Sequence, residues 1–216
     1  MAGFFIKKLL NMNYLGHFYV ASITNSSYCG ALLGDFIKGN QWQHLPHSLQ
    51  LGILLHRRLD SWIDQWVINE QITSLFPNQI RRFAPIALDL YWDYQLASYW
   101  SHWHPQPLPD LTRKIYSQLH HPDLPLSAQR VIESMIHHDW LAQYNQPDFI
   151  FNALQYIQKR MRSTIPVMTL VDTLWNQNQL LHSKTEQLVH NLKQLPFIWR
   201  HKILTEQFSI KYRPHC

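Results

Sequence analysis

Histidine and aspartate side chains recur four residues apart in two segments of the chain. His56, Asp60 and Asp64 keep this spacing, and so do Asp89 and Asp93. On an α-helix, residues four apart lie on the same face, about one turn from each other. A neutral imidazole and a carboxylate on adjacent turns can offer two ligands to one cation. On spacing alone, a hydrogen-bonded pair at the protein surface is the more common explanation.

The neighbouring residues favour a metal site over a surface pair. His56 follows Leu-Gly-Ile-Leu-Leu, and Asp60 stands among leucine, tryptophan and isoleucine. Asp89 and Asp93 lie in Ala-Leu-Asp-Leu-Tyr-Trp-Asp-Tyr, and Asp35 lies in Gly-Ala-Leu-Leu-Gly-Asp-Phe-Ile. An unpaired charge beside an apolar face is costly, so these carboxylates need arginine partners or a metal ion. Arginines could pair with some of them but do not explain the histidines in the same pattern.

A second histidine, His17, is the only one in the first predicted helix. A lone histidine on an apolar helix is more often a core residue whose hydrogen bonds are satisfied. We include His17 because a closed coordination shell needs ligands from helices other than the one that carries His56 and Asp60.

The elements that must position these residues are predicted to be helices. Glycine is scarce at 6 residues, and prolines divide the chain into segments in which apolar residues recur every three or four positions. We predict one all-α domain at residues 12–200, with an N-terminal extension at 1–11 and a C-terminal tail at 201–216. The predicted helices span about 13–23, 27–39, 47–66, 70–82, 85–103, 108–119, 126–143, 147–163 and 166–194.

The amino-acid composition limits which kinds of binding partner and which cellular compartment suit the chain. The chain has 19 Lys and Arg against 14 Asp and Glu, a net charge of +5, which indicates an acidic partner. The basic residues are dispersed, so an acidic protein or a phosphorylated small molecule is as good an explanation as a nucleic acid. Two distant cysteines do not form a disulfide framework, and no apolar run is long enough to cross a membrane. We therefore expect a soluble protein of the cytoplasm.

Four motifs follow one another along the chain: Asn-Tyr-Leu-Gly-His at 13–17, Gly-Ala-Leu-Leu-Gly-Asp-Phe-Ile-Lys-Gly at 30–39, Gly-Ile-Leu-Leu-His-Arg-Arg-Leu-Asp-Ser-Trp-Ile-Asp at 52–64 and Leu-Asp-Leu-Tyr-Trp-Asp at 88–93. Together they resemble the ordered motifs of the bacterial acyl carrier protein phosphodiesterases. The resemblance begins at Met12 and continues more weakly to Arg162. Family members commonly carry histidine at the position of Tyr94, so we assign no role to that tyrosine.

The resemblance implies a helical bundle of the HD-domain phosphohydrolase type. It implies removal of the 4′-phosphopantetheine group from holo-acyl carrier protein with a divalent cation, manganese in preference to magnesium. Such a cation polarises a phosphoryl oxygen, activates water and stabilises the leaving alkoxide. We assign Asp64 and Asp89 only as orienting or surface groups. We assign the metal shell or its immediate support to His17, Asp35, His56, Asp60 and Asp93, and place His56, Asp60 and Asp93 also in the chemistry.

Basic residues near the predicted metal helix could meet the phosphate or the acidic carrier protein. We predict that Arg57, Arg58 and Lys38 bind substrate, and that Arg81 and Arg82 extend the basic rim. An arginine pair neutralised by nearby carboxylates is an equally good explanation of Arg57 and Arg58. The predicted partner is holo-acyl carrier protein, with no nucleic acid and no membrane, and the sequence leaves the oligomeric state open.

Two other functions stay open at this point. One is an HD-type phosphohydrolase that acts on a nucleotide or another small phosphoester. The other is a non-catalytic helical module that binds acidic proteins. Serine-nucleophile, P-loop and dinucleotide-binding motifs are absent from the sequence, which argues against those enzyme classes.

Overall fold

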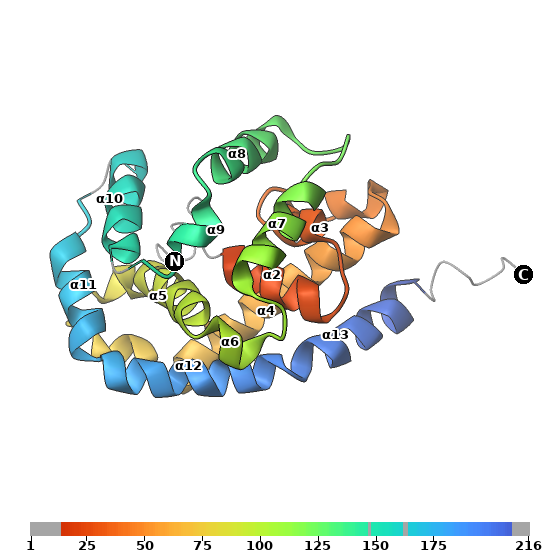
Figure 1. Cartoon of the computed structure of the whole chain (residues 1–216). Coiled ribbons are helices and arrows are strands. Elements are labelled where there is room, and N and C mark those ends of the chain that lie inside the picture. The colour runs from red at the N-terminus through yellow and green to blue at the C-terminus, as the bar shows by residue number, and fades with distance from the viewer. Residues whose placement is uncertain (1–13, 147, 162–163, 209–216) are drawn as a thin grey trace, which may run out of the picture.

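Helices make up the regular structure of this protein. The computed structural model describes residues 14–146, 148–161 and 164–208, and these contain helices and no strand (Figure 1). The predicted all-α class is confirmed. The extension predicted at 1–11 lies outside the described residues, as does the end of the predicted tail from residue 209. The α-helices are α2 (Tyr14–Ile23), α3 (Tyr28–Leu33), α4 (His47–Asn69), α5 (Ala84–Ser98), α6 (Trp100–Trp103), α7 (Leu108–Gln118), α8 (Leu126–His137), α9 (Trp140–Gln143), α10 (Phe149–Met161), α11 (Val167–Asn176), α12 (Asn178–Leu192) and α13 (Leu195–Ile203).

Helix α4 carries His56 and Asp60, and α3 crosses it at a pair of glycines. A Cβ atom placed on Gly30 would lie 2.9 Å from the Cα of Gly52 and 2.7 Å from the carbonyl oxygen of Leu49, closer than real Cβ atoms approach. Because neither glycine has a side chain, the two backbones are in contact. This close crossing brings the end of α3 next to His56.

Helices α2, α5 and α12 complete the frame around α4. Helix α2 packs against α3, α4 and α5, while α12 packs against α5 and α13 packs against α4. Helix α5 begins with Pro85 in its first turn, as predicted, and most of its side chains are buried. In Figure 1, α12 and α13 follow one another along the lower side of the molecule. The four helices α2, α4, α5 and α12 therefore surround the predicted chemistry.

The helix predicted at 70–82 is wrong. Two short 3-10 turns stand there instead, η2 (Ile72–Leu75) and η3 (Arg81–Phe83). Gln71 has a φ of +52°, in the left-handed region, which ends α4. Pro77 lies between the two turns and lacks the N–H that a continuous helix needs.

Other predicted boundaries are displaced. Helix α3 ends at Leu33, six residues before the predicted end, and the chain continues through turns and the 3-10 turn η1 (Gln41–His44). Helix α13 was not predicted, and it crosses the boundary that we place between the domain, ending at residue 200, and the tail, beginning at 201. The long helices predicted at 85–103, 126–143 and 166–194 are each divided in two, with the breaks at Tyr99, at His138–Asp139 and at Gln177.

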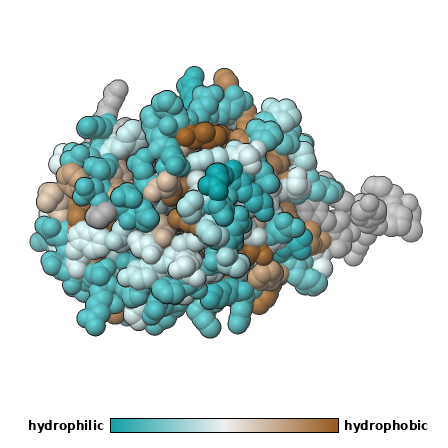
Figure 2. Space-filling view, in the orientation of Figure 1, coloured by the Kyte–Doolittle hydropathy of each residue, from teal (hydrophilic) through white to brown (hydrophobic). Residues whose placement is uncertain are grey.

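The described surface is mixed in character. The face shown in Figure 2 is mostly hydrophilic, and its apolar residues form separate patches. Large apolar side chains that stand exposed include Leu126, Met168 and Ile198. Among the described residues, no helix has the length and the apolar character that a bilayer crossing requires.

Candidate metal centre

Two buried histidines from different helices lie face to face. The ring centroids of His17 on α2 and His56 on α4 are 3.7 Å apart, and the ring planes differ by 12°. Each residue is only 3% exposed. Asp60 lies one turn after His56 and reaches both rings: its two carboxylate oxygens are each 3.3 Å from a histidine Nε2. The structure therefore joins the i, i+4 pair of α4 to the histidine of α2, as the metal hypothesis requires.

The tautomer of His56 is set by the helix that crosses it. Its Nδ1 lies 2.6 Å from the carbonyl oxygen of Ala31 on α3. A carbonyl oxygen only accepts, so Nδ1 donates its hydrogen there and Nε2 is left to face the carboxylates. An imidazole that ligates a metal is commonly oriented in this way by a hydrogen bond from its other nitrogen.

Asp35 is the second carboxylate at His56. It follows the end of α3, and its Oδ1 lies 3.1 Å from Nε2 of His56. The side chain of Asp35 is 10% exposed and that of Asp60 is 30% exposed, so Asp60 is the more accessible of the two. Four of the five residues predicted for the metal shell thus lie together: His17, Asp35, His56 and Asp60.

The histidine nitrogens that face these carboxylates lack hydrogen-bond geometry. Among the described residues, Nε2 of His17 and Nε2 of His56 have no hydrogen-bond partner, although both are buried. A buried polar atom without a partner costs about 1–3 kcal/mol. His17, His56 and Asp60 each offer a ligand atom, and all these atoms lie within 4.8 Å of one another. A divalent cation would satisfy both nitrogens and Asp60 at once, so the donor set fits such an ion.

Charge coupling within the cluster is strong. Burial alone would lower the pKa of His56, but the carboxylates of Asp60 and Asp35 outweigh it and raise the pKa to about 10. The pKa of His17 is lowered by burial and by His56. Burial opposes ionisation of Asp60, yet His56 and His17 hold its pKa well below the usual range. Without a cation, the cluster therefore keeps a proton on His56 and a negative charge on Asp60.

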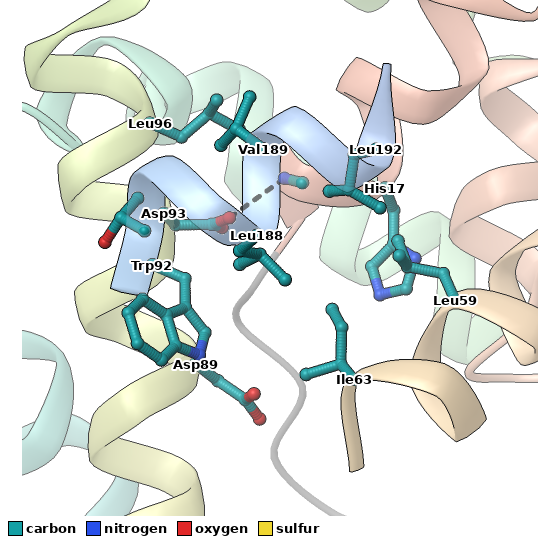
Figure 3. A pocket seen from close by; sticks show the side chains of 12 residues that line it. His17, Leu59, Ile63, Asp89, Trp92, Asp93, Leu96, Leu188, Val189 and Leu192 are labelled. Atoms are coloured by element: carbon teal, nitrogen blue, oxygen red, sulfur yellow. Dashed lines mark hydrogen bonds between the residues drawn. The ribbon is translucent and has the colours of Figure 1, made fainter. Parts of the chain in front are cut away.

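Asp93 lies outside this cluster and holds the helix that carries His17. Its two oxygens accept hydrogen bonds from the backbone N–H groups of Leu15 at 3.0 Å and Gly16 at 2.9 Å, at the start of α2. The dashed line at Asp93 in Figure 3 marks the bond to Gly16. These N–H groups belong to the first turn and have no partner within the helix. Burial raises the pKa of Asp93 to about 8, against the opposing effect of the N–H groups of Gly16 and Leu15. Through these two hydrogen bonds, Asp93 supports the start of α2.

Gly34 is a site residue that the sequence analysis missed. A Cβ atom at this position would lie 2.1 Å from Cγ of the His56 ring and 2.3 Å from its Cδ2. The imidazole therefore occupies the space that a side chain on Gly34 would need. Gly30 and Gly34 lie one helical turn apart and contact residues of α4 that are also one turn apart: Gly30 contacts Gly52, and Gly34 contacts His56. That matching four-residue spacing is the signal that could have identified Gly34.

The predicted substrate-binding residues differ in their surroundings. Arg57 binds the loop after α3: its guanidinium donates hydrogen bonds to the carbonyl oxygens of Ile37 at 2.6 Å and Gly39 at 2.8 Å. Arg58 and Lys38 are exposed. Arg57 thus holds the backbone on both sides of Lys38.

The other two arginines of the predicted rim stand on η3, beyond the end of α4. Arg81 donates to the carbonyl oxygens of Phe76 and Ser74, and Arg82 lies 4.6 Å above the ring of Phe83. From His56 to the end of α4 the helix rises by roughly 20 Å. The printed partners of Arg81 and Arg82 lie at residues 74–83, and their part in substrate binding stays a prediction.

The other acidic, aromatic and cysteine residues differ in their surroundings. Asp64, one turn after Asp60, and Asp89, one turn before Asp93, are both half-buried. Tyr94 packs edge-on against Trp175, with 5.4 Å between ring centroids. Cys29 is buried, and burial raises its pKa to about 11, as expected for an apolar core thiol.

Comparison with known proteins gives consistent matches. A family model described as "Acyl carrier protein phosphodiesterase" matches residues 12–192. The chain is 36% identical over 152 residues to the acyl carrier protein phosphodiesterase of Enterobacter sp. (strain 638), which covers 69% of this chain and 79% of the relative. It is 35% identical over 174 residues to the protein of that name from Serratia proteamaculans (strain 568), with 78% and 90% covered. The same name from Yersinia pestis matches at 34% over 152 residues, with 69% and 79% covered. No solved structure matches the chain.

Proposed function

The chain belongs to the family of acyl carrier protein phosphodiesterases, and we propose that it hydrolyses the 4′-phosphopantetheine group from holo-acyl carrier protein at a divalent-cation site formed by His17, His56, Asp60 and Asp35. One observation carries the cation site: two buried imidazoles from separate helices turn Nε2 toward the same carboxylate, Asp60, without hydrogen-bond geometry. Surface pairs do not show this arrangement, because an exposed histidine and aspartate are free to adopt a good hydrogen bond.

The donor set suggests which cation is held. Imidazole nitrogens together with carboxylate oxygens suit manganese, whereas magnesium prefers oxygen ligands and retains several waters. We therefore propose Mn²⁺ as the resident ion and Mg²⁺ as a weaker substitute. When bound, such an ion polarises a phosphoryl oxygen and lowers the pKa of water.

The residues of the chain divide the remaining tasks. His17 and His56 hold their nitrogens toward Asp60, and Ala31 fixes the orientation of His56 through its carbonyl oxygen. Asp60 is partly exposed, so a phosphodiester that enters the site meets this side of the cluster first. Asp93 acts indirectly, because it fixes the first turn of α2 and with it the position of His17.

The substrate protein would meet a basic surface beside the cluster. Exposed Lys38 lies three residues after Asp35, on the loop that Arg57 holds, whereas Arg58, two residues from both His56 and Asp60, stands on another side of α4. These charges and the net charge of +5 favour encounter with an acidic carrier protein. The cytoplasmic location and the HD-type fold stay predictions.

A mass-shift assay tests the function. Purified protein, Mn²⁺ and holo-acyl carrier protein should give a carrier that has lost the mass of 4′-phosphopantetheine, and a chelator should stop the loss. His56→Ala should abolish turnover, while His138→Ala, which removes an exposed histidine of α8's C-terminal end, should not. An unchanged carrier together with hydrolysis of a nucleotide would instead support a general phosphohydrolase. Unchanged carrier binding by His56→Ala and no hydrolysis by any form would support a binding module.

A further inference from the structure

A narrow apolar slot opens beside the histidine pair. It has a volume of about 30 Å³ and lies between α4, α5 and α12 (Figure 3). His17 borders it, and so does Leu59, the residue before Asp60. Its walls are mostly aliphatic, with Ile63 from α4 and Leu188 and Val189 from α12. Asp89, Asp93 and Thr185 also line the slot, which therefore begins at the cluster and is mainly, but not wholly, apolar.

One polar group in the slot is a donor. Trp92 of α5 lines the slot and is 6% exposed, and among the described residues its indole N–H has no hydrogen-bond partner. An indole N–H that is buried usually finds an acceptor. The slot is thus suited to a small apolar group that has an oxygen close behind it.

The size of the slot limits what it can hold. A cavity needs about 10–15 Å³ of such space for one water-sized group, so the slot has room for roughly two. A whole phosphopantetheine arm is far too long for it. A branched carbon with two methyl groups has the required size and apolar character.

We propose that this slot binds the two methyl groups of the pantoyl unit of the substrate. This inference rests on the proposed function. In 4′-phosphopantetheine the phosphate is joined through one methylene to a carbon that carries two methyl groups, and the next carbon carries a hydroxyl. With the phosphate at His17 and Asp60, the dimethyl carbon is the first apolar group to follow and falls at the slot. The hydroxyl oxygen behind it is the acceptor for the indole N–H of Trp92.

The slot would make the enzyme specific for its substrate. Each buried methyl-sized group contributes roughly a factor of four to binding. Two methyl groups that are bound in the transition state should therefore raise kcat/KM by roughly ten- to twentyfold. A phosphodiester with an unbranched chain at this position would lose that factor.

The test compares two carriers with the wild-type protein and Mn²⁺. One is holo-acyl carrier protein, and the other carries an arm in which hydrogens replace the two methyl groups. We expect kcat/KM to be roughly ten- to twentyfold higher for the natural arm. Equal values for the two carriers would overturn the slot proposal and leave the proposed function intact. Turnover of neither carrier would overturn the proposed function, and the slot proposal with it.

A variant that fills the slot provides the second arm of the test. Val189→Ile adds one methylene to the slot wall and keeps a β-branched side chain, so the helix is little disturbed. Val189→Ile should lower kcat/KM several-fold for the carrier with the natural dimethyl group and leave kcat/KM unchanged for the carrier that lacks the two methyl groups. The ratio of the two kcat/KM values should therefore fall toward one. Val171→Ile makes the same change on α11, away from the slot, and should keep the ratio. An equal loss on both carriers with Val189→Ile would contradict the proposal.

Discussion

Replacement of Gly34 by alanine should displace His56 and leave most of the fold in place. The backbone at Gly34 is right-handed helical, with φ −49° and ψ −33°, so alanine meets no strain in the main chain. Its Cβ would lie 2.1 Å from Cγ of His56, whereas ordinary contact begins near 3.4 Å. The ring must therefore move by about 1.3 Å, and a 1 Å displacement of a reacting group costs roughly 100-fold in rate.

The same overpacking should cost about 1–3 kcal/mol of folding free energy. The assay is turnover of holo-acyl carrier protein at saturating Mn²⁺, together with a urea unfolding curve of each variant. Gly39→Ala serves as the control, because a Cβ there meets nothing within 4 Å although its φ of +53° strains an alanine. We expect Gly39→Ala to lose stability and keep activity. If Gly34→Ala retained wild-type turnover, the placement of His56 against α3 would be refuted.

Three further changes test other parts of the account. Gly52→Ala places a Cβ 2.7 Å from Cα of Gly30, so the helices must separate; we expect a loss of about 1–3 kcal/mol in urea unfolding, and an unchanged midpoint would contradict the crossing. Asp93→Ala removes the acceptor for two N–H groups of α2, so it should lower the free energy of unfolding by about 1 kcal/mol and weaken Mn²⁺ binding. Asp93→Asn keeps one acceptor oxygen and should restore part of the stability and part of the Mn²⁺ affinity. The pKa of His56, raised from 6.5 to about 10, means that cation binding displaces a proton: Mn²⁺ affinity should rise by about tenfold per pH unit across that window, as calorimetry in two buffers can measure. With the sign of a raised pKa, the contribution of His56 to the stability of the metal-free protein should be full below pH 6.5 and be lost as the pH approaches 10, as urea unfolding at several pH values can measure.

The chemistry-bearing residues could be predicted because their spacing matches a helical turn. His56 and Asp60 lie four apart on a helix with one apolar face, and α4 forms where the pattern predicts it. His17 could be included only through the resemblance of the motifs and the need for a second helix. Its stacking on His56 depends on how α2 crosses α4, which no local pattern encodes.

The role of Asp93 could not be read from its spacing. An aspartate among apolar residues predicts a buried carboxylate with a partner, and that much agrees with the structure. The partners are backbone N–H groups of a helix 77 and 78 residues away in the sequence. Whether a buried carboxylate meets a cation or a helix terminus depends on tertiary packing, so the sequence pattern is the same for both.

The helix predicted at 70–82 failed for a local reason. Its apolar residues, including Ile72, Leu75 and Phe76, recur at helical intervals. They pack as two short turns, because Gln71 adopts a left-handed backbone and Pro77 interrupts the hydrogen bonding. Periodicity identifies the buried side chains in such a segment but not the conformation of the backbone between them.

We propose that His17, His56 and Asp60 hold one divalent cation in the active protein. Crystals grown with Mn²⁺ test this site by anomalous diffraction recorded near the manganese absorption edge. We expect one strong peak where the two Nε2 atoms and the carboxylate of Asp60 converge, and no such peak in crystals of His56→Ala. A peak held by other residues, or none in crystals of protein that converts holo-acyl carrier protein, would contradict it.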